Sequence, residues 1–359
     1  MTRAGERKIT IKDVAHAAGM SLGTTSGILN GATGFSEETK KKIWLAASEL
    51  NYHPNPQARG LRSGGGQAKR QNSGIIIHIT HMADENLTLS EPGAMRSAIL
   101  SLEGEKMGLY PITYMYYKLK GFQCPPVLNG HIDGAIVGTP HVEIVKTLKD
   151  RLPLVLMDVP FSLENSNIPV VNINFREGFA RLFDLLKKNG HRKIGTLSVS
   201  AANPHDELMN ETVIHNEILS SAKTAGIEIH SESDLPIRVT PEIHDREMRA
   251  AATRFAKHIR DGNISAIVSP NSSYTESLFA IFGEMGIKVP ENVSLAGVEH
   301  RIKAPEFNIT SITYDWTGMI KTSLEALKNL IDGKNMTCCE FLVRPGFYEG
   351  KTVGKIRQG

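Results

Sequence analysis

The sequence is poor in cysteine and in aromatic residues, and it contains no long hydrophobic run. Its 359 residues include three cysteines, of which Cys124 is isolated and Cys338 and Cys339 are adjacent. No CxxC spacing therefore indicates a zinc site or a disulfide framework. No apolar run approaches the roughly 20 residues that span a membrane, and the polar start MTRAGERK lacks the apolar core of a signal peptide. We therefore expect a cytoplasmic protein without a membrane segment.

Motifs for catalysis and for metal binding are also missing. No GxSxG, HExxH or paired-carboxylate arrangement occurs in a context that supports catalysis. His78 and His81 resemble a metal-binding pair, but residues three apart on a strand point to opposite faces of the sheet. The glycines at 64–66 lack the strand, lysine and helix of a phosphate-binding loop. We expect no catalytic residues, no cofactor and no metal ion.

Positive charge is concentrated at the N-terminus. Residues 1–73 contain eleven lysines and arginines against five acidic residues, a net charge of +6, whereas the remaining residues carry −3. A basic segment on a mildly acidic body indicates binding to a polyanion, because neutralising phosphates releases condensed counterions. The alternative is a merely solvated N-terminal extension.

The helical pattern of the basic segment argues against that alternative. A first helix is predicted over 12–18, with Val14, Ala15 and Ala18 on its apolar face, and Gly19 allows a tight turn. Ser21 can cap a second helix with Thr25, Ile28 and Leu29 on its inner side. A third helix begins at Ser36 and buries a stripe formed by Ile43, Ala46, Ala47 and Leu50. Three short helices with a glycine turn predict a helix-turn-helix.

The amino-acid sequence of this segment resembles that of one protein family in particular. From Thr10 to Gly64 the sequence resembles the head of the lac repressor (LacI/GalR) family of bacterial transcription regulators. The matching stretches are TIKDVAHAAGMS, TTS, ILNG, SEET and LNYHPNPQARGLRSG. The alternative is a generic helix-turn-helix of another family. The resemblance implies a three-helix, lambda-repressor-like DNA-binding domain over 1–53, whose second helix enters the major groove.

The resemblance also implies DNA contacts residue by residue. Thr10 and Ile11 correspond to positions where the chain reaches the DNA ahead of the first helix. The recognition helix and its start supply Ser21, Leu22, Gly23, Thr24, Ser26, Gly27 and Asn30. The remaining matched positions, which contact mainly the DNA backbone, are Ser36, Thr39, Tyr52, Asn55, Arg59 and Leu61. Ser21 and Ser36 can also act as helix caps.

Residues 54–63 resemble the hinge helix of the family, and residues 64–73 form a glycine-rich linker. Asn55 would cap the hinge helix, Pro56 occupies its favoured first position, and Leu61 matches a leucine wedged into the minor groove. Gly60 stands where a serine or similar residue is usual, which lowers helix propensity. We therefore expect looser ligand control, or weaker DNA affinity, than in a typical member.

From Gly74 onward, short apolar runs alternate with amphipathic stretches in two series. The apolar runs of the first series are GIIIHIT, YPITYMY, DGAIVG and LPLVLMDV. Those of the second series are VVNINF, KIGTLSV, ISAIVSP and VSLAGVE. This alternation predicts an α/β fold with parallel sheets. The continuing resemblance implies a two-lobed sensor similar to periplasmic binding proteins, with lobe 1 over 74–173 and 314–343, and lobe 2 over 174–313 and 344–359.

Ligands of such folds bind at the carboxyl ends of the strands between the lobes. The strand-end residues, for which a capping or lobe-contact role is the alternative, are Met82, Pro140, Asp158, Asn271, Glu299, Tyr314 and Trp316. The family's ligand-clamping arginine has no counterpart in NPHDELMNETVIHNEIL, over 203–219. A carbohydrate or a derivative is the implied effector, although this departure argues against a simple hexose.

The sequence thus predicts a homodimeric regulator, most simply a repressor, that binds a pseudo-palindromic double-stranded DNA operator and responds to a small molecule. Dimerisation is expected because one head makes too few contacts for tight specific binding. The alternative is a solute-binding protein with the same body fold, which should have a signal peptide and no basic head.

Overall fold

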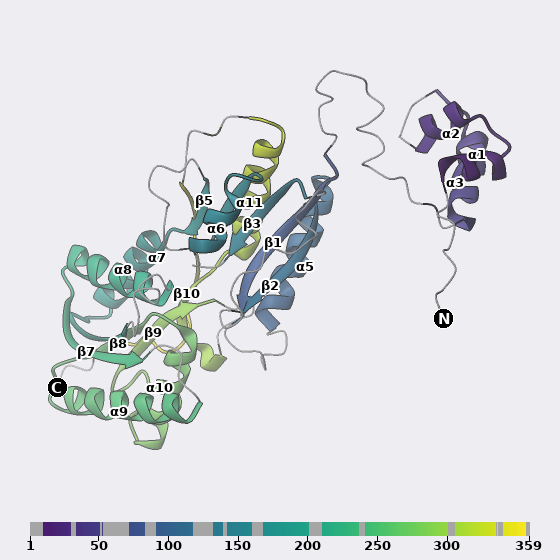
Figure 1. The fold of residues 1–359 in the computed structure, drawn as a ribbon. Helices are drawn as coiled ribbons and strands as arrows, with labels where there is room; N and C mark the ends of the chain where they lie inside the picture. Colours follow the sequence, from purple (N-terminus) through teal and green to yellow (C-terminus); the bar gives the residue numbers. More distant parts are fainter. Residues whose placement is uncertain are drawn as a thin grey trace. The chain divides into compact units, whose positions relative to one another are not determined.

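The computed structural model describes residues 10–29, 34–50, 52, 72–82, 91–117, 132–138, 142–159, 168–200, 210–236, 241–300, 306–334, 336 and 340–356. The chain divides into two compact units, Met1–Gln71 and Asn72–Gly359. Figure 1 shows the helices of the first unit and the two sheets of the second. No helix in the described ranges is both long and apolar enough to cross a membrane.

The first unit contains the predicted three helices, α1 (Ile11–Ala17), α2 (Leu22–Leu29) and α3 (Glu37–Glu49). Its small core consists of Val14, Ile28, Leu29, Ile43, Ala46 and Ala47. One expectation needs correction, because Ile11 does not precede the first helix. It is the first residue of α1 and packs against this core, where its apolar side chain leaves water.

The second unit contains two six-stranded sheets. The first sheet has the order β11-β5-β4-β3-β1-β2. Its strands are β1 (Ile75–Met82), β2 (Tyr110–Tyr117), β3 (Gly134–Gly138), β4 (Leu154–Met157), β5 (Val170–Ile173) and β11 (Glu340–Val343). The second sheet has the order β12-β10-β9-β8-β6-β7. Its strands are β6 (Lys193–Ser200), β7 (Glu228–Pro236), β8 (Ala266–Ser269), β9 (Ser294–Glu299), β10 (Thr310–Thr313) and β12 (Gly346–Tyr348). The chain therefore enters the first sheet again after completing most of the second.

Helices cover both faces of each sheet. In the first lobe, α5 (Glu91–Lys106) and α11 (Trp316–Ile331) share one apolar core, and α6 (Val142–Leu148) belongs to the core on the opposite face. In the second lobe, α7 (Phe175–Lys188) and α8 (Asn210–Ala225) share one core, and α9 (Pro241–Arg260) and α10 (Ser272–Glu284) share the other. Burial on both faces explains why the central strands are continuous apolar runs.

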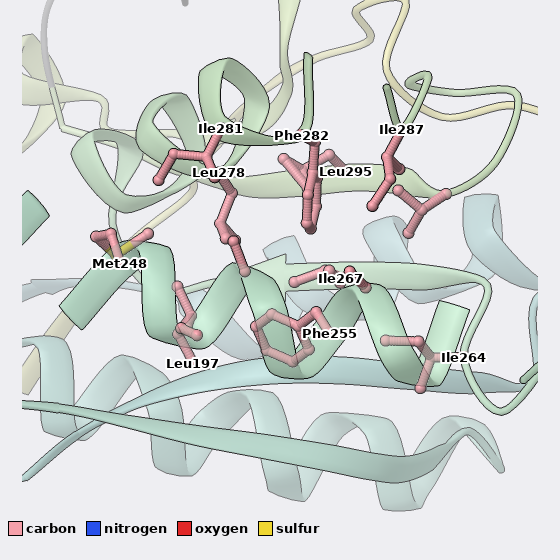
Figure 2. Close-up of a cluster of buried hydrophobic side chains, with 14 residues drawn as sticks. Leu197, Met248, Phe255, Ile264, Ile267, Leu278, Ile281, Phe282, Ile287 and Leu295 are labelled. Carbon is pink, nitrogen blue, oxygen red and sulfur yellow. The ribbon is translucent and has the colours of Figure 1, made fainter. Parts of the chain in front are cut away.

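The core beneath α9 and α10 shows how closely these layers pack. Phe255 of α9 and Phe282 of α10 are fully buried beside Ile267 and Leu295 (Figure 2). A Cβ atom on Gly195 of β6 would lie 2.7 Å from the ring of Phe255, so only glycine fits at that position. Fully burying an apolar side chain such as Phe255 contributes about 1.5–3 kcal/mol to the free energy of unfolding.

The α/β class with a helical head and a two-lobed body is confirmed, but the strictly parallel sheets are not. The pair β10 and β12 is antiparallel, while the other pairings in both sheets are parallel. The edge strand β12 can pair antiparallel because no crossover helix precedes it. Only Arg344 and Pro345 separate it from β11, which belongs to the first sheet.

Candidate DNA-binding and effector sites

The first candidate site is the outer surface of α2. Gly19 adopts a φ of 63°, which allows the tight turn between α1 and α2. The predicted Ser21 cap is present, since the backbone N–H of Thr24 donates to Ser21 Oγ at 3.0 Å. Thr25, Ile28 and Leu29 are buried against the other helices. One side of α2 is therefore fixed in the core, and the opposite side faces solvent.

The residues expected to contact DNA lie around that solvent-facing side. Gly23 is exposed, and a Cβ atom added to it would meet only Ser21 Oγ, at 3.8 Å. Ser21 is also exposed, and four more of these residues are half-buried, namely Leu22, Thr24, Ser26 and Gly27. Small residues leave the helix backbone open to close approach, which suits insertion into a major groove.

The start of α3 offers a second polar surface. Thr39 N–H donates to Ser36 Oγ at 3.2 Å, and the two hydroxyl oxygens are 2.8 Å apart. Backbone N–H groups and hydroxyls at a helix N-terminus suit phosphate oxygens. Tyr52, in contrast, is half-buried and packs against the head core. The other expected DNA contacts lie outside the described residues, and these are Asn30, Asn55, Arg59 and Leu61.

A cavity of about 550 Å³ lies where the two lobes meet. The first-lobe side of the cavity is lined by Asp158, just after β4, and by Asn172 of β5. The second-lobe side is lined by Asn174, which caps α7, and by Val213 and Glu217 of α8. Asp158 has a φ of 56°, a backbone conformation that is uncommon for a residue other than glycine. Among the expected ligand-binding residues whose side chains the structure describes, Asp158 is the one that lines this cavity.

Tyr314 and Trp316 form an aromatic cluster beside the crossing between the lobes. Their rings stack with centroids 4.8 Å apart and an angle of 19°, and Phe175 meets Tyr314 edge-on at 5.6 Å. Trp316 is 3% exposed, and its indole N–H donates to the backbone oxygen of His300 at 2.7 Å. This bond connects α11, on the first sheet, with the residue that follows β9 in the second sheet.

The remaining expected ligand residues occupy separate places. Asn271 caps α10, since its Oδ1 accepts from Ser273 N–H at 2.8 Å. For this residue the structure thus shows the capping role that was the alternative to ligand binding. Glu299 is fully buried at the carboxyl end of β9. Met82 ends β1, but its side chain lies outside the described part, as does Pro140. The structure thus brings Asp158, Tyr314 and Trp316 to the lobe boundary and leaves Asn271 and Glu299 as individual strand-end positions.

Sequence reasoning missed two residues beside this cluster, Arg96 of α5 and His78 of β1. The guanidinium carbon of Arg96 lies 4.6 Å from the centroid of the Trp316 ring. His78 is 5% exposed, and its Nδ1 has no hydrogen-bond partner within the described residues. Burial and the nearby charge of Arg96 lower the pKa of His78 to about 4. In the described residues, no group of three potential metal ligands occurs.

A larger cavity, of about 790 Å³, lies at the opposite end of the second lobe. Its wall includes Arg192 and Lys193 at the start of β6, Arg260 at the end of α9, and Lys355. Arg192 donates to the backbone oxygen of Lys187 at 3.0 Å, near the end of α7. Cations are stabilising at helix C-termini, which explains this basic rim. Because the cavity is remote from the carboxyl ends of the strands, we do not assign the effector to it.

The comparisons with known proteins agree with this two-part arrangement. Residues 10–55 match bacterial regulatory proteins of the lacI family, and residues 183–353 match a periplasmic binding protein-like domain. The HTH-type transcriptional repressor PurR of Vibrio atlanticus (strain LGP32) is 25% identical over 358 residues, covering 96% of this chain and 98% of the relative. PurR of Vibrio parahaemolyticus serotype O3:K6 (strain RIMD 2210633) is 26% identical, covering 97% and 99%.

The fold is also similar to that of solved repressors. A crystal structure of the lac repressor dimer, bound to operator and the anti-inducer ONPF, superposes with a TM-score of 0.73 at 18% identity, covering 97% of this chain and all of that chain. At this identity the similarity shows the fold alone. Taken together, the comparisons show a DNA-binding head of the lacI family of bacterial regulatory proteins over 10–55 and a periplasmic binding protein-like domain over 183–353, in a chain that is similar over nearly its whole length to HTH-type transcriptional repressors.

Proposed function

We propose that this chain is a transcriptional repressor that binds a pseudo-palindromic DNA operator as a homodimer and is controlled by a small ligand between its two lobes. The observation that carries the proposal is α2, held by Thr25, Ile28 and Leu29 on one side and open on the other. The net charge of +6 over residues 1–73 supplies the attraction to phosphates.

Within the recognition helix, glycines replace side chains that could contact bases. Bidentate side-chain contacts contribute roughly 1–3 kcal/mol of discrimination each. Their absence at Gly23 and Gly27 transfers base recognition to Leu22, Thr24, Ser26 and Asn30, of which the first three lie on α2. We therefore expect an operator preference that differs from that of family members with an arginine at the position of Gly27.

Operator selection with the full chain tests this proposal. A pool of random duplexes is selected with the wild-type chain and with Gly27→Arg, and binding of the selected duplexes is then measured over a salt series. We expect a two-fold symmetric site, affinity that falls steeply with salt, and a different preferred half-site for Gly27→Arg. An exposed Arg246→Met substitution on α9 serves as the control, since its half-site should remain that of the wild type. Salt-independent binding, or selection of no common site, contradicts the proposal.

Exposed apolar side chains on both lobes support the homodimer. Met95 and Leu102 of α5 are 40% and 61% exposed, and Tyr110 and Ile112 of the edge strand β2 are 56% and 43% exposed. In the second lobe, Phe307 is 53% exposed and stacks on Phe279 of α10 at 5.0 Å. Met95 and Leu102 are seven residues, about two turns, apart on α5, so they lie on one face of that helix. A second copy of the chain is the partner that symmetric operator recognition requires.

A further inference from the structure

The cavity at the far end of the second lobe has the size of a ligand site. Its volume is about 790 Å³, and small-molecule pockets have volumes of about 300–1,000 Å³. Lys193 begins β6, and Ser265 and Asn292 precede β8 and β9, so the cavity lies at the amino ends of these strands. Among the described residues, it shares no lining residue with the cavity between the lobes. The distal cavity, as we call it, is therefore a separate site.

His191 holds one wall of the distal cavity in place. Its side chain is 2% exposed. Its Nδ1 lies 2.8 Å from Ser265 Oγ, and its Nε2 lies 2.9 Å from the backbone oxygen of Gly354. Both ring nitrogens are thus engaged in hydrogen bonds that connect the start of β6 with the segment before β8 and with the C-terminal segment. Because a buried polar network with satisfied partners is rigid, this wall is preformed.

Lys355 is fixed to the same framework through its neighbours. The N–H of Gly354 donates to Ser294 Oγ at 3.0 Å, and the N–H of Ile356 donates to the backbone oxygen of Asn189 at 3.0 Å. The backbone of Lys355 is therefore held on both sides, and its exposed side chain lines the cavity. A preorganised group loses less conformational freedom when a ligand binds.

Four cationic side chains line the distal cavity, against a single acidic one, Glu291, among the described residues. Arg192 donates to two backbone oxygens. Lys193, Arg260 and Lys355 make no side-chain hydrogen bond or ion pair in the part of the chain that the structure describes. The nearby helix C-termini favour these cations but leave their donors unused, because backbone N–H groups already bond to the last carbonyls of α9 and α10. Like charges around one cavity repel one another, and a bound anion would remove that repulsion.

Apolar side chains form much of the remaining lining. Ile264 and Ile287 follow the ends of α9 and α10 and are buried (Figure 2). Ile259, Met285 and Pro290 line the same cavity and are half-buried. Covering apolar surface contributes favourable free energy. A ligand with an apolar body would therefore bind here more tightly than an inorganic ion.

We propose that the distal cavity binds a small phosphate monoester with an apolar body, such as a nucleoside monophosphate, as a second ligand besides the effector. A phosphate monoester carries a charge of about −1.5 to −2 at pH 7 and three strong acceptor oxygens, which match the unused donors of Lys193, Arg260 and Lys355. A carboxylate has a single charge and two oxygens, so it would satisfy fewer of them. The proposal does not depend on operator recognition, because none of these residues belongs to the head.

Calorimetric titration of the full chain tests the proposal with AMP, phenyl phosphate, inorganic phosphate and adenosine. We expect AMP or phenyl phosphate to bind at least about tenfold more tightly than inorganic phosphate, because only the esters carry an apolar body. The affinity for the ester should fall as the salt concentration rises. In the double variant Arg260→Met, Lys355→Met, the affinity for the ester should fall by about tenfold or more. Any binding of adenosine between the lobes should stay unchanged in this variant.

Two further variants separate the loss of charge from damage to the fold. Arg260→Lys combined with Lys355→Arg keeps both positive charges and should bind the ester more tightly than the double methionine variant does. The exposed Arg246→Met on α9 is the matched control and should bind it as the wild type does. No ester binding in the wild type, or an unchanged affinity in the double methionine variant, overturns the inference. Weaker binding of a non-operator duplex by that variant would also overturn it, because the cations would then bind a polynucleotide.

Discussion

At the residue scale, His78 makes stability depend on pH. Its pKa is lowered from 6.5 to about 4, first by burial and second by the charge of Arg96. The unfolded chain keeps the ordinary value, so it binds more protons than the folded chain between pH 6.5 and 4. The stability associated with neutral His78 is therefore complete above pH 6.5 and is lost as the pH falls toward 4.

Replacing His78 by Asn should remove this pH dependence. Between pH 7 and 4.5, the wild-type body should lose about 2–3 kcal/mol more unfolding free energy than His78→Asn does. Urea unfolding of the full chain, followed through Trp316 in a Trp44→Phe background, measures the difference. If the unfolding free energy changed equally with pH in the wild type and in His78→Asn, His78 would already be able to accept a proton in the folded chain.

The same residues show where sequence reasoning ends. The positions of Asp158 and Tyr314 were predictable because each directly follows a short strand, and that of Trp316 because it begins the next helix. Arg96 was not, because AMRSAIL shows only a polar position on an amphipathic helix. Its partners are distant in sequence, and they meet it only after α5 and α11 pack on the same face of the first sheet.

At the element scale, helix caps and apolar runs were predictable, whereas strands without such runs were not. Ser21, Ser36 and the buried faces of α2 and α3 follow from local chemistry. The strand β7, with the sequence EIHSESDLP, has no apolar run, because it lies at the edge of the second sheet and pairs with β6 alone. The edge strands β11, of four residues, and β12, of three residues, were missed because each is too short to give a clear strand pattern.

The cap of α3 supports a prediction about the head. Ser36→Ala removes the hydroxyl that accepts from Thr39 N–H, which should lower head stability by about 1 kcal/mol. Ser48→Ala, at an exposed position inside the same helix, should leave it unchanged or slightly higher. Denaturant titration of the full chain, read from Trp44 emission with Trp316→Phe, reports on this unit. Equal midpoints for the two variants would exclude a stabilising role for the cap.

At the scale of the whole molecule, the different roles of the two units explain why the prediction from sequence and the structure agree best in the head. The head must fit one double helix with a fixed geometry, so its helices and turn residues are closely specified. The body needs only two α/β sheets, which many apolar sequences can form, while its ligand residues vary with the ligand. The similarity of the head to the lacI family was therefore predictable from the sequence, and the effector was not.

Dimer formation should decide operator affinity, because one head contacts a single half-site. Leu102, the most exposed large apolar residue of α5, is 61% exposed. Leu102→Glu places a charge on the proposed interface, where its burial would be strongly unfavourable. Sedimentation should then show monomers at concentrations where the wild-type chain is dimeric.

Affinity for the full operator should fall by about tenfold or more in Leu102→Glu, while the much weaker binding to an isolated half-site stays unchanged. This difference separates lost pairing from a damaged head, since damage to the head would weaken both. Ile356→Glu, a similar change at a 37% exposed residue of the second lobe, should leave sedimentation and affinity as they are. A Leu102→Glu chain that remains dimeric would place the interface elsewhere and would leave the exposed α5 and β2 side chains without this role.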